Sequence, residues 1–159
     1  SVPCRYEMNI KELVWHAELH QSRHERSRRE ILDHLRQIEP EVVERAGHPS
    51  CGLLLDAYHM ERSGSGGRGF ENYPAERIFA FQFSDVPNAP PSAQNRPTDR
   101  LPPGKGKVRW REVFQLLREK GYAGYLAYEA PNPESWARPP EDVAREAAQA
   151  TRKLLEGID

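Results

Sequence analysis

The sequence predicts an α/β fold built on parallel strands, and three observations support this. Short apolar runs recur along the chain, a loop follows each run, and the later runs alternate with segments of helical periodicity. A continuous apolar run of about four to eight residues is typical of a strand buried on both faces of a parallel sheet. The order strand, loop, strand, helix, strand, helix is the pattern such sheets produce.

Three segments are expected to form strands. Residues 51–56 (CGLLLD) and 124–130 (GYLAYEA) are continuous apolar runs, and both are predicted to be buried. Between them, residues 77–85 (RIFAFQFSD) alternate in the manner of a strand. The alternation places three phenylalanines on one face, Phe79, Phe81 and Phe83.

Three further segments are expected to be helical. The first carries apolar residues at helical spacing, Ile31, Leu35, Ile38 and Val42, with Gly47 as its expected end. The second, residues 108–121 (VRWREVFQLLREKG), has one apolar stripe and is expected to end at Gly121. The last, residues 139–157, has prolines at its start and Gly157 at its end.

Length and composition exclude several classes of protein. The chain has 159 residues, which indicates one domain. Lys and Arg number 23 against 24 Asp and Glu, and this balance favours neither nucleic acid nor acidic membranes as partners. The two cysteines, Cys4 and Cys51, are too few for a disulfide framework, which suits a reducing cytoplasm. No apolar run approaches the roughly 18 residues that span a bilayer.

The predicted strands share a chemical feature, since each carries an oxygen-bearing side chain near its end. These side chains are Asp56, Gln82 and Glu129, and His59 follows Asp56 by three residues. The carboxyl ends of parallel strands meet at one edge of a sheet, where active sites are commonly found. Two carboxylates and an amide at this edge would form an oxygen-rich site that favours Mg²⁺ or Mn²⁺.

Each of these residues also has a structural interpretation. Asp56 could cap a helix or form a turn, Gln82 could be a hydrogen-bonded core amide, and Glu129 could cap the turn at Pro131. The purely structural interpretation weakens for the set, because unpaired carboxylates at a buried strand end are costly unless a cation meets them.

Four ordered segments resemble the second half of the xylose-isomerase-like TIM barrels. They are LLLDAYHMERSG, IFAFQFSDVP, DRLPPGKG and LREKGYAGYLAYEAPNP. The resemblance implies a partial (β/α)₈ barrel in which residues 41–159 supply the C-terminal half, with the last three strands. Residues 1–40 are an atypical charged segment, expected to be helical. That superfamily contains sugar phosphate isomerases and epimerases, inosose-processing enzymes and 3-dehydroshikimate dehydratases.

The resemblance also implies roles for individual residues. Asp56, Gln82 and Glu129 would bind a divalent metal, with Co²⁺ or Zn²⁺ as alternatives to Mn²⁺ or Mg²⁺. His59 would face a sugar-like substrate, and Arg100 matches the position that binds a substrate anion, although it could instead be a loop arginine paired with Asp99. The metal would stabilise an enediolate, with Glu129 as the base and His59 serving the substrate oxygen.

The glutamine at position 82, with Asp85 after it, resembles the dehydratases more than the epimerases, which often have histidine there. The choice between isomerase or epimerase and dehydratase stays open.

The same resemblance raises two questions about completeness. The family uses a fourth ligand, a glutamate, and neither Glu7 nor Glu25 lies in a sequence typical of a strand end. A full barrel takes about 250 residues, so this chain has room for half of one. Open sheet edges invite pairing with another chain, which favours a homo-oligomer or a complementary half-barrel chain as partner. The alternative function is therefore a non-catalytic half-barrel that acts as a subunit or interaction module.

Overall fold

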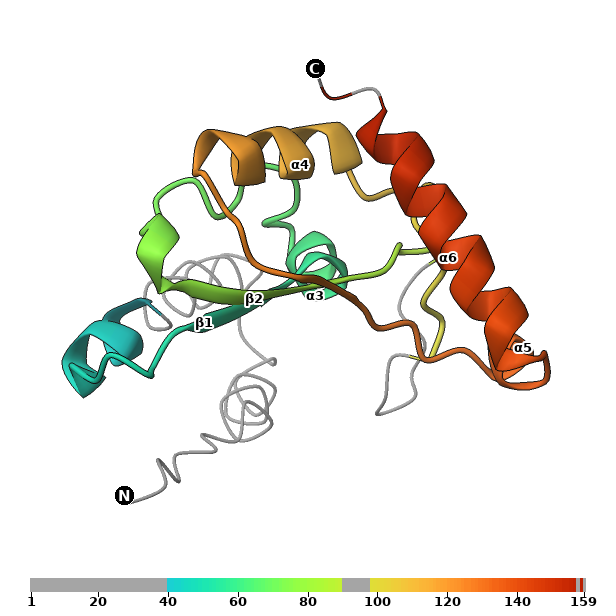
Figure 1. Ribbon diagram of the computed structural model, residues 1–159, viewed down its shortest axis with the longest axis horizontal. Coiled ribbons are helices and arrows are strands. Elements are labelled where there is room, and N and C mark those ends of the chain that lie inside the picture. Colours follow the sequence, from blue (N-terminus) through green and yellow to red (C-terminus); the bar gives the residue numbers. More distant parts are fainter. Residues whose placement is uncertain (1–39, 90–97, 157, 159) are drawn as a thin grey trace, which may run out of the picture. The chain divides into compact units, whose positions relative to one another are not determined.

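The structure is a computed structural model that describes residues 40–89, 98–156 and 158 (Figure 1). The chain divides into two units, Ser1–Val42 and Val43–Asp159, and the second is described here by itself. The expected helix over residues 1–39, with Glu7 and Glu25, lies outside the described residues. None of the helices in the part that the structure describes is long and apolar enough to cross a membrane.

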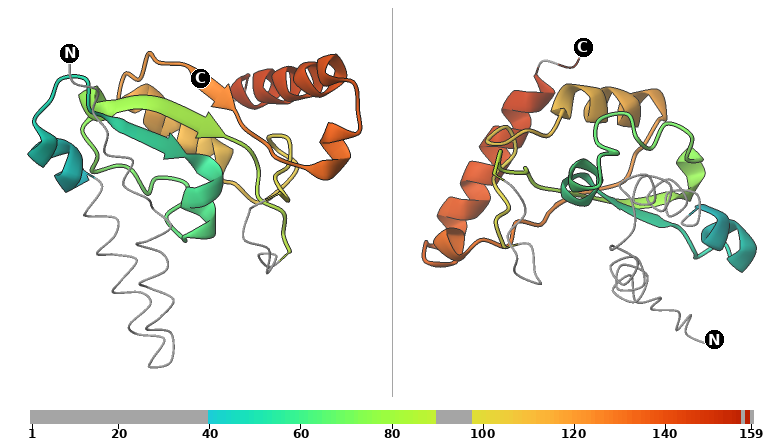
Figure 2. Two further views of the ribbon diagram at one scale, coloured as in Figure 1. Left: turned by 90° about the horizontal axis from the view of Figure 1, so that it is seen from below. Right: turned by 180° about the vertical axis from the view of Figure 1, so that it is seen from behind.

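Three parallel strands form one sheet, in the order β1-β2-β3. Their bounds are Leu53–Asp56 for β1, Ile78–Phe83 for β2 and Leu126–Tyr128 for β3. This confirms the predicted parallel α/β arrangement. The strands lie side by side in the left view of Figure 2, and all three run in the same direction, so their carboxyl ends lie at the same end of the sheet. The loops that follow the strands therefore leave from one edge.

One face of the sheet packs against helix α4 (Trp110–Glu119), which Figure 2 shows behind the strands. Phe81 and Phe83 are buried on this face. The Trp110 ring meets Phe83 edge-on at a centroid distance of 6.1 Å and stacks on Phe114 at 5.4 Å. Burial of such aromatic side chains supplies the largest hydrophobic contributions to a small core. The predicted apolar stripe of this helix is therefore the one that covers the sheet.

The opposite face of the sheet is partly open, which corrects the prediction of a first strand buried on both sides. Leu54 is 56% exposed and Phe79 is 49% exposed. Phe79 does not share the face of Phe81 and Phe83. Consecutive residues of β1 pair with Ile78 and then with Ala80, so Phe79 is left without a partner on β1. This irregularity places Phe79 outside the regular alternation of β2.

The third strand is also less buried than predicted. It is three residues long, its middle residue is exposed, and the preceding Tyr125 is almost fully exposed. It lies at an edge of the three-stranded sheet, where one side of the strand has no neighbouring strand in the described part. An edge position explains why an apolar sequence remains accessible here.

The helix ends follow the predictions where they are described. Residues 40–46 are helical and Gly47 has φ of 59°, while Gly121 follows α4 with φ of 66°. Glycine tolerates this left-handed conformation, which often ends helices. Helix α6 (Pro140–Leu155) begins at the predicted prolines, and Gly157 lies outside the described residues.

Three short elements were not predicted. They are α3 (Ala57–Arg62), the 3₁₀ turn η1 (Ala75–Arg77) and α5 (Pro133–Trp136). Each is too short to show a hydrophobic period in the sequence.

Candidate active site

Asp56 ends strand β1 and uses its two carboxylate oxygens differently. Oδ1 accepts a hydrogen bond of 2.9 Å from the backbone N–H of Tyr58 and caps helix α3. Oδ2 accepts a bond of 2.9 Å from Nη1 of Arg100. The side chain is only 7% exposed. The structural interpretation of Asp56 as a helix cap is therefore correct, and the second oxygen faces a cation at the same time.

Arg100 lies at the centre of the site, and its side chain is 3% exposed. Besides Asp56, its Nη1 contacts the carbonyl oxygen of Glu129 at 3.1 Å, Oε2 of Glu129 at 3.4 Å and Oγ of Ser84 at 3.3 Å. Its Nη2 lies 2.9 Å from Nε2 of His59. Nε is buried and has no hydrogen-bond partner among the described residues. One guanidinium thus contacts residues at or just after the carboxyl ends of all three strands.

A separate cluster holds the chain next to Arg100. The hydroxyl of Tyr58 donates to Oδ1 of Asp99, and Arg62 donates to Oδ2 of the same carboxylate. The Tyr58 ring lies under the Arg100 guanidinium at 4.5 Å from its centroid, a cation–π geometry. Asp99 therefore pairs with Arg62, whereas Arg100 pairs with Asp56, contrary to the alternative of an Arg100–Asp99 pair.

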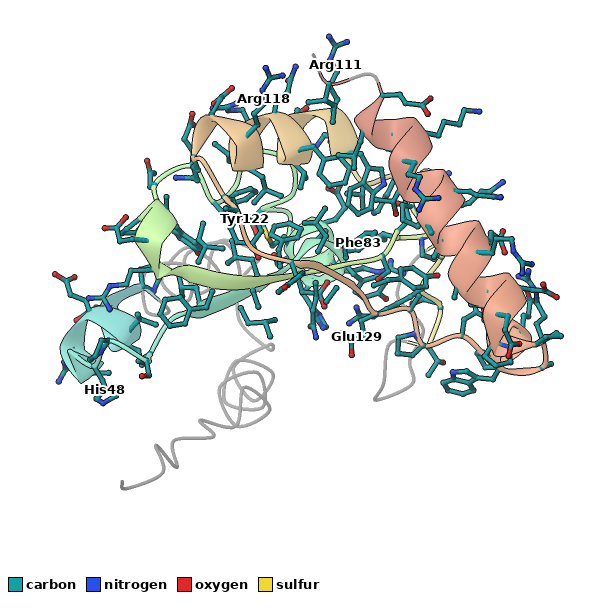
Figure 3. All side chains as sticks on the ribbon, viewed as in Figure 1. His48, Phe83, Arg111, Arg118, Tyr122 and Glu129 are labelled. Carbon is teal, nitrogen blue, oxygen red and sulfur yellow. The ribbon has the colours of Figure 1, made fainter. Side chains whose placement is uncertain are left out.

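Glu129 follows β3, and its backbone N–H donates to the carbonyl of Phe83 at 3.2 Å, which extends the strand pairing. Figure 3 shows Phe83 on the α4 side of the sheet and Glu129 on the other side. The Glu129 side chain is partly exposed, so it is accessible from the open face while Oε2 contacts Arg100.

Gln82 is paired in register with Asp56 on one side and with Ala127 on the other. Residues paired in this way point to the same face of a sheet, and Glu129 lies two positions beyond Ala127, on that face again. The register therefore gives Asp56, Gln82 and Glu129 a common face at the carboxyl ends of the strands. Their assignment as metal ligands stays a prediction.

The donor set fits a hard divalent cation. The two carboxylate oxygens, Asp56 Oδ2 and Glu129 Oε2, both lie within 3.4 Å of one nitrogen atom of Arg100. Oxygen ligands of this kind suit Mg²⁺ or Mn²⁺. Within the described ranges, no cluster of three His, Cys, Asp or Glu side chains could hold a metal by itself. The amide of Gln82 would be needed as a third ligand.

His59 lies in helix α3, which corrects the expectation that it follows the strand on a loop. Its Nε2 is 3.7 Å from Oδ2 of Asp56 and 2.9 Å from Nη2 of Arg100. A guanidinium can only donate, so Nε2 accepts and the ring proton sits on Nδ1. Partial burial of the ring lowers the pKa of His59 and the Arg100 charge acts in the same direction, while Asp56 and Glu129 oppose them. The neutral imidazole is therefore favoured, although 61% of the side chain is exposed.

Asp85 is the site-supporting residue whose role sequence reasoning missed. Its carboxylate is fully buried, and four N–H groups donate to it at 2.8 to 2.9 Å, those of Val86, Gly104, Val108 and the Trp110 indole. Its backbone also pairs with Leu101, the residue after Arg100. Asp85 thereby anchors the segment that carries Arg100. The sequence showed an acidic residue after the strand, but its partners lie up to 25 positions away.

Comparison with known proteins agrees with this architecture. Residues 30–154 match the family described as the xylose isomerase-like TIM barrel. An inosose isomerase from Halalkalibacterium halodurans is 30% identical over 115 residues, which cover 72% of this chain and 40% of that protein. A 3-dehydroshikimate dehydratase from Pseudomonas putida is 27% identical over 115 residues, with 72% of this chain and 18% of that protein covered.

Solved structures show the same fold. The crystal structure of IOLI protein with a binding zinc atom superposes with a TM-score of 0.66 at 23% identity, over 75% of this chain and 42% of that one. A xylose isomerase domain protein from Alicyclobacillus acidocaldarius gives a TM-score of 0.59 at 27% identity, over 71% and 40% respectively. The three parallel strands thus form part of an α/β barrel, and the chain spans less than half the length of the relatives it matches.

Proposed function

The chain belongs to the xylose isomerase-like TIM-barrel family, and we propose that it forms the C-terminal half of a divalent-metal-dependent isomerase, epimerase or dehydratase. The substrate class we propose is a small polyhydroxylated carbonyl compound, such as a sugar, a sugar phosphate or a cyclic polyol ketone. One observation carries the proposal: Asp56 Oδ2 and Glu129 Oε2, from β1 and the end of β3, converge on one cation. The names of the two relatives, an isomerase and a dehydratase, support the reaction class.

Asp56, Gln82 and Glu129 are the proposed metal ligands, with Mn²⁺ or Mg²⁺ as the metal and Co²⁺ or Zn²⁺ as alternatives. The bound metal would act as a Lewis acid that stabilises the negative charge of an enediolate. The parallel register supports this ligand set because it places the three residues on one face. The fourth ligand of the family lies outside the described residues or outside this chain.

Glu129 and His59 are the proposed proton carriers. Glu129 is partly exposed on the open face, where a carboxylate can reach a substrate carbon and remove its proton. His59 has a neutral Nε2 beside Arg100, so it can accept or return a proton at a substrate oxygen. In a dehydratase the same base would act next to the ketone while a hydroxyl group leaves.

Arg100 is the proposed contact for a substrate anion, through Nη2. This nitrogen contacts His59, which lies at the exposed side of the cluster, whereas Nη1 is shared by Asp56 and Glu129. A substrate carboxylate or phosphate would meet a charge-assisted donor at this point. His59 would then lie beside the same substrate group.

The activity is proposed for a complete barrel. We propose that the half-barrel begins at residue 41. We also propose a cytoplasmic location, because two cysteines are too few for a disulfide framework. A second copy or a complementary half-barrel chain is the partner that we propose for the open face of the sheet. Exposed Leu54 and Phe79 on the open face support this, since an apolar sheet face is normally covered.

A second function is favoured by that same face. A half-barrel whose apolar face contacts another protein could serve as a non-catalytic subunit. The two functions differ in one respect, because a subunit needs the apolar face and does not need the polar cluster at the strand ends.

Metal binding by the purified chain separates the two functions. Mn²⁺ is expected to raise the melting temperature, and Asp56→Asn or Glu129→Gln is expected to reduce that rise, because each removes a proposed ligand. Glu141→Gln is the matched control, since Glu141 lies in the exposed first turn of α6. Isomerase or dehydratase turnover should follow the same order. Equal metal responses in all four proteins would support the subunit function instead.

A further inference from the structure

The two carboxylates among the proposed metal ligands are already partly neutralised by a group of the protein itself. Nη1 of Arg100 lies 2.9 Å from Oδ2 of Asp56 and 3.4 Å from Oε2 of Glu129. These are the two oxygen atoms whose charge would attract a divalent cation. An arginine cannot lose its proton in a protein, so this positive charge is permanent.

Arg100 is held in this position from several sides. The Tyr58 ring covers one face of the guanidinium, and the side-chain amide of Asn132 donates to the Arg100 carbonyl at 3.0 Å. On either side in sequence, Asp99 is bound by Arg62 and Leu101 is paired with Asp85. The guanidinium therefore stays near the carboxylates when another cation approaches.

We infer that Arg100 is a counter-cation that weakens the binding of divalent metal by Asp56 and Glu129. The inference rests on the proposed metal site. Two effects act in the same direction. The guanidinium occupies a lone pair of Asp56 Oδ2, and its charge repels a second cation held by the same two carboxylates.

The charge effect is large on the scale of metal binding. Two like charges a few ångströms apart in a partly buried site repel each other much more strongly than they would in bulk water. Part of this is offset, because loss of Arg100 also loosens the carboxylates. Removal of the charge is still expected to tighten Mn²⁺ binding by at least about tenfold.

The test compares Mn²⁺ dissociation constants, measured from free Mn²⁺ by electron paramagnetic resonance on the full 159-residue chain. Arg100→Gln is expected to bind at least about tenfold more tightly than wild type. Arg62→Gln is the matched control, because it removes the same charge from an arginine that also lies near the Tyr58 ring but contacts Asp99 instead of Asp56. The double variant Arg100→Gln with Asp56→Asn should lose the gain.

A second measurement uses the wild-type protein and is independent of whether Arg100→Gln folds. Titration with Mg²⁺ should shift the side-chain N–H resonances of Arg100 in a saturable manner, with the same constant as metal binding, and leave those of Arg62 unchanged.

The outcomes separate this inference from the proposed function. If Mn²⁺ binds wild type and Arg100→Gln equally, or if Mg²⁺ binds without moving the Arg100 resonances, the inference is wrong and the metal site stands. If neither protein binds Mn²⁺, both the inference and the proposed metal site are wrong. Tighter binding by Arg100→Gln, abolished by Asp56→Asn, supports both.

Discussion

Asp56 and Asp85 are two buried aspartates at the ends of neighbouring strands, and their carboxylates have opposite kinds of partner. Asp85 accepts four hydrogen bonds from neutral N–H groups, three of the backbone and one of the Trp110 indole. Asp56 accepts one backbone hydrogen bond and pairs with the Arg100 cation. One carboxylate is saturated by fixed donors, and the other shares a partner that also contacts Glu129 and His59.

The difference in partners distinguishes a carboxylate that supports the fold from a carboxylate that is available for binding or chemistry. A carboxylate saturated by backbone donors cannot change partners without unfolding the loop that supplies them, because each N–H would be left unpaired. A carboxylate that pairs with a shared side-chain cation uses fewer fixed backbone donors, so its remaining lone pairs can meet a metal or a substrate. Burial alone does not distinguish the two cases, but the identity of the donors does.

The largest expected effect is the loss of Asp85. Asp85→Asn replaces one acceptor oxygen by a donor and leaves two buried N–H groups facing it, so the free energy of unfolding should fall by about 3 kcal/mol or more. Urea denaturation measures this, with Asp142→Asn on the exposed side of α6 as the control. A loss below about 1 kcal/mol would show that Asp85 is replaceable.

A smaller loss of stability is expected for Asp56→Asn. The amide oxygen can still cap α3, and Glu129 remains near Arg100, so the loss should be about 2 kcal/mol. The same denaturation series checks this value. Metal-induced stabilisation should be reduced in Asp56→Asn and persist in any folded Asp85 variant. A loss equal to that of Asp85→Asn would break the contrast between the two carboxylates.

The substitution Trp110→Phe tests a single donor to Asp85. It keeps an aromatic ring over Phe83 but removes the indole N–H that donates to Oδ2 at 2.8 Å. The free energy of unfolding should fall by about 1 to 2 kcal/mol. Trp136→Phe is the matched control, because Trp136 is exposed, and it should change stability very little. Similar losses for both substitutions would contradict the role given to the Asp85 network.

The smallest effect is expected at an exposed carboxylate, which serves as a baseline. Hydrogen bonds from Arg68 lower the pKa of Glu119 below its ordinary value of 4.5. The ionised form is therefore favoured in the folded protein, and its stabilisation is present above the ordinary pKa and lost as pH falls through the lowered one. Melting temperatures at neutral and acid pH should show a slightly smaller pH dependence for Glu119→Gln than for wild type. Because the pair is exposed, a loss comparable to that of Asp56→Asn would be unexpected.

The sequence predicted the parallel strands, because these depend on local patterns and on strand order. It also placed Asp56, Gln82 and Glu129 near the strand ends, whereas their common face follows from the pairing register. It could not predict that Leu54 is exposed, since an apolar run looks the same whether its second face is covered or open. The Asp85 network joins residues far apart in sequence, so no local pattern reveals it. Likewise, the helix that carries His59 is six residues long, too short for a helical period.

The irregular step in pairing between β1 and β2 has a consequence for the changes of length that this chain can accommodate. The step lies between Leu53 and Leu54, at the strand ends remote from Arg100, and from Leu54 onward the two strands advance together until Asp56 meets Gln82. A change in the length of the segment between residues 63 and 77 can be absorbed at that step, because one extra residue there is accommodated without shifting the later pairs. A change of length before β2 would therefore leave Asp56 paired with Gln82 and the carboxylates of the candidate site in place.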